Sequence, residues 1–153
     1  MRPSKGTSKT KENETVSVWR FRLDPTKEQE QKLFHTFYLC RRSYNEALEE
    51  RVTAHRENGV SIRYTDQQNR LPVWKREHLE YKEVHSHVLQ NVLQRLNQAF
   101  VNFFEKRAKF PKFKNKFVLR SIIYPQARNT YFRDNKVYLA KIGWVRIRAR
   151  VSF

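Results

Sequence analysis

Residues 106–117, KRAKFPKFKNKF, combine basic and aromatic side chains in a pattern suited to nucleic-acid binding. The stretch holds six lysines or arginines, three phenylalanines and no acid. Lysines can neutralise phosphates while aromatic rings stack on unpaired bases. A basic linker whose phenylalanines fill a core would have the same composition. We expect the phenylalanines of this stretch to be buried and its lysines to contact phosphate.

A second candidate is the polar face of a helix predicted to begin near Ser86. Gln90, Asn91 and Gln94 carry amides, and such amides can make paired hydrogen bonds to an adenine edge. Because Gln90 and Gln94 are four residues apart, we expect both on one exposed face, opposite the apolar side of the helix. Base reading and an ordinary polar surface explain these residues equally well.

Catalytic and metal chemistry find little support in this sequence. His85 and His87 are two residues apart, but no third His, Cys or acid stands at a regular zinc-ligand spacing. Two-metal phosphodiester cleavage needs clustered carboxylates, and Asp134 is the only acid after residue 105. We therefore expect no catalytic residue, no metal site and no cofactor.

Positive charge is concentrated in the last third of the chain. Of a net charge of +17 over 153 residues, +13 lies between Lys106 and Phe153, where 14 Lys or Arg face one acid. Concentrated positive charge gains affinity for a polyanion by displacing condensed counterions.

A membrane partner is disfavoured. The residues of the basic region alternate as in strands, and no apolar run reaches the ~18 residues that span a bilayer. The single cysteine, Cys40, points to a reducing cytosol.

The elements that must position these residues begin with a strand and a long helix. Residues 1–15 are polar and are expected to form a flexible basic arm, and residues 16–24, VSVWRFRLD, read as a strand. Thr26 and Gln29 form a capping box that opens a helix at Lys27, and apolar spacing continues to a stop at Asn58-Gly59. A break near residues 39–41 would divide this stretch into two helices.

Two further helices and several strands follow. Thr65 and Gln68 form a second capping box, and Pro72 is expected to end or restart the helix that it opens. Ser86 is expected to cap the longest periodic stretch, whose apolar stripe comprises Val88, Leu89, Val92, Leu93, Leu96, Ala99, Phe100, Phe103 and Phe104. After Pro111 the segments FVLRSIIY, KVYLA and WVRIRARV read as strands, separated by Asn129, Asp134-Asn135 and Gly143. The fold class is α+β: a small β-barrel or curled sheet with a helical lobe inserted after its first strand.

Five ordered segments across residues 18–150 resemble the N-terminal part of the transposon-encoded OrfB/TnpB family. They are FRLDPTKEQEQKL, CRRSYNEAL, VLQNVLQRLNQAFVNFFEKRAKFPKFKNK, SIIYPQ and LAKIGWVRIR. Members of this family are RNA-guided DNA nucleases related to type V CRISPR effectors. The resemblance implies a first wedge strand at 16–24, a helical recognition lobe at 25–108, and a basic hinge with the remaining wedge strands at 109–153. Ala140 departs from the proline that the family usually has there.

The resemblance also implies roles for individual residues. Recognition lobe and wedge grip a guide RNA and read a short motif in double-stranded DNA beside the target. The motif-reading positions correspond to Tyr64, Ser86, His87, Gln90 and Gln94, and the amide chemistry described above adds Asn91 to them. The residues expected on the nucleic-acid backbone are Lys106, Arg107, Lys109, Lys112, Lys114, Lys116, Arg120, Arg146 and Arg148. The RuvC-like nuclease domain of the family lies beyond the segments matched here.

The sequence therefore predicts a cytoplasmic, nucleoid-associated prokaryotic protein that binds guide RNA and duplex DNA without cutting either. One alternative is a subunit of a split enzyme, with the nuclease domain on a separate chain. Another is a free-standing repressor of the transposon that binds DNA without RNA. A neighbouring reading frame with carboxylate motifs and a CxxC pair would favour a truncated or split enzyme.

Overall fold

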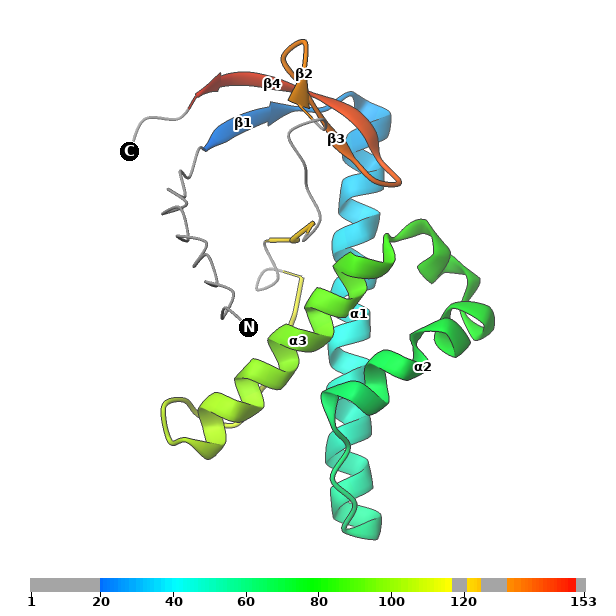
Figure 1. The fold of residues 1–153 in the computed structure, drawn as a ribbon, viewed down its shortest axis with the longest axis vertical. Coiled ribbons are helices and arrows are strands. Elements are labelled where there is room, and N and C mark those ends of the chain that lie inside the picture. Colours follow the sequence, from blue (N-terminus) through cyan, green and yellow to red (C-terminus); the bar gives the residue numbers. More distant parts are fainter. Residues whose placement is uncertain (1–19, 117–120, 125–131, 151–153) are drawn as a thin grey trace, which may run out of the picture.

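The computed structural model describes residues 20–116, 121–124 and 132–150, in the order strand, helices, strands (Figure 1). The helical elements are α1 (Lys27–Asn58), α2 (Tyr64–Glu77), the short 3₁₀ helix η1 (Leu79–Glu83) and α3 (Ser86–Phe104). The strands are β1 (Phe21–Asp24), β2 (Phe132–Arg133), β3 (Lys136–Leu139) and β4 (Gly143–Arg150). This order confirms the predicted α+β class. No helix in the described ranges is both long and apolar enough to cross a bilayer.

Helix α1 begins and ends where the sequence predicted. The Thr26 hydroxyl accepts from the backbone N–H of Gln29 at 3.2 Å, and the Gln29 side chain accepts from the backbone N–H of Thr26 at 3.0 Å. Gly59 closes the helix in the left-handed region, at φ +63°. The helix runs unbroken through residues 39–41, because Leu39 and Cys40 are fully buried in the core and hold that turn in place.

The predicted boundaries of α2 are wrong. The helix begins at Tyr64, one residue before the predicted cap, because the Asp66 carboxylate accepts from the backbone N–H of Arg63 at 2.9 Å. It also continues through Pro72 to Glu77. Proline removes one helical hydrogen bond, but the adjacent Leu71 is buried in the core, and this packing holds the helix together across the proline.

Helix α3 is capped by a different residue from the one predicted. The His85 Nδ1 atom accepts from the backbone N–H of His87 at 3.2 Å, so His85 is the cap and Ser86 is the first helical residue. The Ser86 hydroxyl instead accepts from the Lys75 ammonium at 2.6 Å. A neutral imidazole nitrogen can accept a hydrogen bond as a serine oxygen does, and here it displaces the serine from the cap.

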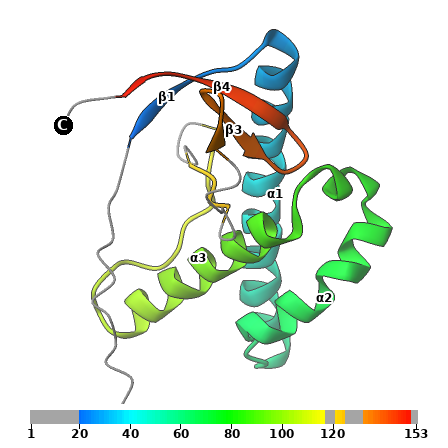
Figure 2. The same ribbon diagram turned by 45° about the horizontal axis from the view of Figure 1, so that its top comes forward.

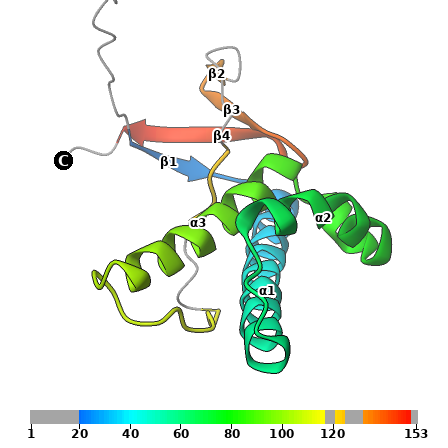
Figure 3. The ribbon, with the colours of Figure 1, turned by 60° about the horizontal axis from the view of Figure 1, so that its bottom comes forward.

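The core of the helical lobe is the junction of α1, α2, η1 and α3. Most of the predicted apolar stripe of α3 is buried in it: Val88, Leu89, Val92, Leu93, Leu96 and Phe100. The stripe does not extend to Phe104, which is 73% exposed. Helix α1 crosses the N-terminal part of α3, and the two helices diverge toward their C-terminal ends (Figures 1 and 3), so the last turn of α3 passes beyond the core.

The four strands form one antiparallel sheet in the order β1-β4-β3-β2. Strand β1 pairs with β4, which confirms that the first strand joins the late strands across the inserted helices. Asp134 and Asn135, both at positive φ, make the predicted turn between β2 and β3. The pairing of β1 with β2 that would close a barrel is not seen in the described ranges, so the barrel stays a prediction.

The predicted strand FVLRSIIY is wrong for residues 121–124, which form no regular element; its first half and Asn129 lie outside the described residues. Ile122 and Tyr124 instead pack against the core of the helical lobe. The Tyr124 hydroxyl also donates to the Ala140 carbonyl at 3.4 Å. This segment therefore links the lobe to the sheet, which lies across the N-terminal end of α1 (Figure 2).

Candidate nucleic-acid interface

The predicted motif-reading residues come together where α2 faces the first half of α3. The Gln94 amide donates to the Tyr64 hydroxyl at 3.2 Å, which joins the two helices at their surface. Gln94 is exposed, whereas Gln90 is half-buried and not exposed as predicted. Gln94 is therefore the amide of this face that is most open to a nucleic acid.

Asn91 is half-buried, and its side-chain oxygen is hidden from solvent. Its side-chain oxygen is buried and has no hydrogen-bond partner within the part of the chain that the structure describes. An unpaired buried acceptor costs about 1–3 kcal/mol. Asn91 is thus a poorer candidate for reading a base than the sequence suggested.

Basic side chains gather beside the N-terminus of α3. The Lys75 ammonium, from α2, lies 2.6 Å from the Ser86 hydroxyl, and the His85 and His87 rings are 5.0 Å apart. Burial lowers the pKa of Lys75, as does the positive charge of Lys141 in the turn between β3 and β4. Burial likewise lowers the pKa of His85, with further contributions from His87, Lys75 and Lys141.

We call this group the basic cluster: Lys75, His85, His87 and Lys141. Backbone N–H groups at a helix N-terminus also favour a phosphate, so its position suits a phosphate group. Sequence reasoning missed Lys75 and Lys141, because no local spacing connects α2 with the β3–β4 turn. No three His, Cys, Asp or Glu side chains in the described ranges are arranged to hold a metal ion.

The basic segment, residues 106–116, is fastened to α1. The Asn45 side chain accepts from the Lys114 N–H at 2.8 Å and donates to the Lys114 carbonyl at 2.9 Å. The Lys114 ammonium lies 4.8 Å from the centre of the Tyr44 ring, and burial, followed by the charge of Arg95, lowers its pKa. Lys114 is therefore engaged in contacts within the protein and is less available to a phosphate than the exposed lysines.

The other lysines of the basic segment face solvent. Lys106, Lys109, Lys112 and Lys116 are exposed, as is Arg107, which pairs with Glu105. These are the side chains that the sequence predicted to contact phosphate, and the structure leaves them at the surface.

The prediction that the phenylalanines of this segment are buried is wrong for the two that the structure describes. Phe110 is 45% exposed and Phe113 is 61% exposed, while Pro111 between them is buried. The Phe110 ring packs edge-on against Phe100 and Phe103 of α3, with centroids 5.5 and 5.1 Å apart. Phe110 thus extends the aromatic end of α3. Phe117 lies outside the described residues.

Strand β4 presents the remaining predicted basic residues. Val145 is fully buried, whereas Arg146 and Arg148 on either side of Ile147 are exposed. The Arg148 guanidinium also pairs with the Asp24 carboxylate of β1 at 3.1 Å. Arg120 lies outside the described residues.

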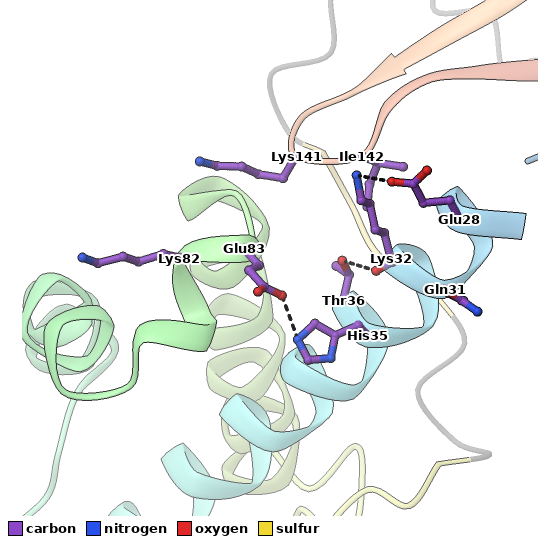
Figure 4. Close-up of a pocket in the computed structure, with 9 residues that line it drawn as sticks. All are labelled: Glu28, Gln31, Lys32, His35, Thr36, Lys82, Glu83, Lys141 and Ile142. Atoms are coloured by element: carbon purple, nitrogen blue, oxygen red, sulfur yellow. Dashed lines mark hydrogen bonds and ion pairs between the residues drawn. The ribbon is translucent and has the colours of Figure 1, made fainter. Parts of the chain in front are cut away.

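A cavity of about 770 Å³ opens between α1, η1 and the β3–β4 turn (Figure 4). His35 and Glu83 meet across it at 2.9 Å, and Glu28 pairs with Lys32 at 3.6 Å. The side chains of Lys82 and Lys141 extend away from the His35–Glu83 pair. Because acids and bases alternate around this cavity, it lacks the uniform positive charge that a polyanion requires.

The chain is similar to one known domain family and to two curated proteins. Residues 18–59 match the helix-turn-helix domain of the IS605 OrfB family. In the described part of that range the structure has β1 and the single helix α1, with no turn between two helices.

Two curated relatives match most of the chain. The Escherichia coli (strain K12) protein named "Putative RNA-guided DNA endonuclease InsQ" is 32% identical over 135 residues, 87% of this chain. A Streptomyces pristinaespiralis protein named "Putative RNA-guided DNA endonuclease" is 37% identical over 127 residues, 81% of this chain. The chain spans about a third of the length of each relative, 34% and 31%. With its OrfB helix-turn-helix region and this homology, the chain corresponds to the N-terminal part of an OrfB/TnpB protein.

Proposed function

We propose that this chain is the nucleic-acid-binding portion of a TnpB-like, RNA-guided DNA endonuclease. In this proposal the recognition lobe is residues 25–108, and the wedge comprises residues 16–24 and 109–153. The lobe reads a short motif in duplex DNA, while the basic segment and β4 hold the guide RNA. The observation that carries the proposal is the exposed Gln94 amide, hydrogen-bonded to Tyr64 on a surface that adjoins the basic cluster.

The two parts of this surface have different tasks. Contacts to phosphate fix the position of a protein on a duplex but carry no sequence information. The basic cluster is suited to that task. A glutamine amide can make two hydrogen bonds to one adenine in the major groove, and Tyr64 holds the Gln94 side chain in place for it. Base pairing with the guide would then read the rest of the target.

The test is a selection from duplexes with a randomised motif, performed with the 153-residue chain and an RNA from the same genetic locus. Gln94→Ala should reduce the preference for the selected motif about ten-fold, because a paired contact to a base is worth about 1–3 kcal/mol. Affinity for scrambled duplex should stay unchanged, because the residue carries no charge. Gln90→Ala should have a smaller effect, since Gln90 is half-buried.

Two control variants separate base reading from surface charge. Gln98→Ala removes an exposed amide one turn further along α3 and should keep the motif preference. The double variant Lys109→Ala/Lys112→Ala should weaken binding to all sequences alike and reduce the log–log salt slope by about 1.8, at roughly 0.9 per phosphate contact. The proposal fails if the wild-type chain binds no nucleic acid, and motif reading fails if Gln94→Ala retains the full preference.

A further inference from the structure

The diverging C-terminal ends of α1 and α3 border a groove of about 390 Å³. It lies at the opposite end of α3 from the basic cluster, so motif reading does not use it. Residues from both helices, from the loop after α1 and from the basic segment line this groove. Its volume lies in the range of small-molecule sites and suits about one nucleotide.

Four phenylalanines form one wall of the groove: Phe100, Phe103, Phe104 and Phe110. They contact one another continuously, with ring centroids 5.1–6.4 Å apart. Phe104 is 73% exposed and Phe110 is 45% exposed. Because the four rings are contiguous, these two leave a continuous aromatic surface open to a ligand.

The rim of the groove is cationic. Arg51 and Arg56 line it from α1, together with His55, and no acidic residue of the described ranges does so. The Arg51 guanidinium lies 5.1 Å from the centre of the Phe100 ring, while Arg56 is exposed. The basic segment, which contributes Phe110, adds the exposed Lys109 and Lys112 nearby in sequence.

Open aromatic rings with a cationic rim are what a nucleotide requires, since the base stacks on the ring and the phosphate meets the cation. An apolar peptide or a second copy of the chain would use the rings but would gain nothing from the arginines. The bases of a duplex are already stacked on one another and cannot enter.

We infer that this groove binds an unpaired base of a single-stranded nucleic acid. Phe104 and Phe110 provide the stacking surface, and Arg56 contacts a phosphate of the same strand. The inference rests on the proposed nucleic-acid-binding function and adds to it a single-stranded segment, held at the end of the lobe remote from the motif-reading face.

The test compares labelled single strands that contain the same number of phosphates. One probe is a 12-nucleotide oligoadenylate, as RNA and as DNA, and the other is the abasic strand of equal length. The 153-residue chain should bind the base-bearing strands about ten-fold more tightly than the abasic strand, as stacking of one base predicts.

Substitutions in the groove test whether the preference for base-bearing strands arises there. Phe104→Ala should bring the ratio of the two affinities close to one and leave the abasic affinity unchanged. Phe104→Leu, which keeps an apolar side chain without a ring, should do the same. Arg56→Gln should weaken both strands equally. Phe34→Ala is the matched control, because Phe34 is 63% exposed on α1 and does not line the groove.

The outcomes separate this inference from the proposed function. Binding of both strands with equal affinity, or a ratio that Phe104→Ala and Phe104→Leu leave intact, would overturn the inference but not the proposed function. Failure to bind any strand or duplex would overturn both. A dimer in sedimentation that Phe104→Leu dissociates would show that a second copy fills the groove. Circular dichroism of each variant checks that α3 stays folded.

Discussion

The helical lobe and the sheet are held together in different ways. The lobe has a continuous core of buried side chains from α1, α2, η1 and α3. In the described part of the sheet the buried apolar side chains are Val145 and the neighbouring Ile142, while Phe21, Leu23, Phe132 and Trp144 are each at least 40% exposed. Side-chain packing therefore stabilises the lobe, whereas the sheet depends mainly on backbone pairing and on its contacts with the lobe.

The largest expected effect follows from the density of the lobe core. Leu96→Ala removes a fully buried side chain from the centre of α3 and should lower the free energy of unfolding by about 2–5 kcal/mol. Val145→Ala should cost less, about 1.5 kcal/mol for two methylene-sized groups. Urea unfolding, followed by circular dichroism, measures both values.

Hydrogen exchange shows whether the two regions are independent. Val145→Ala should raise the exchange of amides in β1, β3 and β4 and leave those of α1 and α3 unchanged. Equal increases in the lobe and the sheet would mean that the molecule opens as one unit, and the contrast between the regions would be lost.

A polar network inside the lobe gives the next largest effect. The Gln67 side chain accepts from the Arg51 guanidinium and donates to the Ala47 carbonyl, both at 2.9 Å, so it joins α2 to α1. Gln67→Leu leaves a buried guanidinium N–H without its acceptor and should cost about 1–3 kcal/mol. Gln31→Leu, the same change at an exposed position of α1, should stay within about 0.5 kcal/mol in the same urea titration.

The connection between lobe and sheet predicts an intermediate effect. The Gln29 side chain completes the capping box of α1 and also donates to the Trp144 carbonyl of β4 at 2.7 Å. Gln29→Ala removes both interactions and should destabilise the protein by about 1–2 kcal/mol. Exchange of the β4 amides should rise as well. Unchanged β4 exchange would show that the sheet does not depend on this contact.

The smallest effect is expected from His85. Burial and the charges of His87, Lys75 and Lys141 lower its pKa, so the unfolded chain binds a proton more readily than the folded one. Its contribution is fully present above its unfolded pKa of about 6.5 and is lost as the pH falls through the lowered folded value. Protonation also removes the Nδ1 acceptor that caps α3.

Urea unfolding at pH 7.5 and 5.5 should therefore show a loss of stability on acidification. His85→Asn keeps a capping oxygen and should reduce that loss. His55→Asn, the same change at an exposed position of α1, is the comparison variant. If the free energy of unfolding falls equally in the wild type and in His85→Asn on acidification, titratable groups other than His85 cause the loss of stability.

Local signals predicted the fold better than they predicted the site. The capping box predicted at Thr26 and Gln29 is confirmed, because its hydrogen bonds join residues close in sequence. The capping box predicted at Thr65 and Gln68 is wrong, because the Asp66 carboxylate accepts from the Arg63 backbone N–H and the helix therefore begins earlier. The sequence offers both possible helix starts, and the pattern alone does not decide between them.

The site depends on contacts between distant elements. The exposure of Phe104 follows from the direction in which α3 leaves α1, and the basic cluster combines Lys75 of α2 with Lys141, whose charge acts on it from the β3–β4 turn. Neither arrangement is encoded in spacing along the chain. The residue types of the interface could therefore be predicted, but not which of them face outward.

The paired hydrogen bonds between Asn45 and Lys114 bear on the entropy of binding. The Asn45 side chain donates to the Lys114 carbonyl and accepts from the Lys114 N–H, as the backbone of a paired β-strand residue would. These two bonds fix the direction of the backbone at this point of the basic segment. Fixing a residue costs roughly 1–2 kcal/mol of conformational entropy. Here folding meets that cost before any ligand arrives. The backbone at Lys114 is thus already ordered, and we expect a phosphate backbone to bind the neighbouring exposed lysines with less loss of conformational freedom than on a free loop.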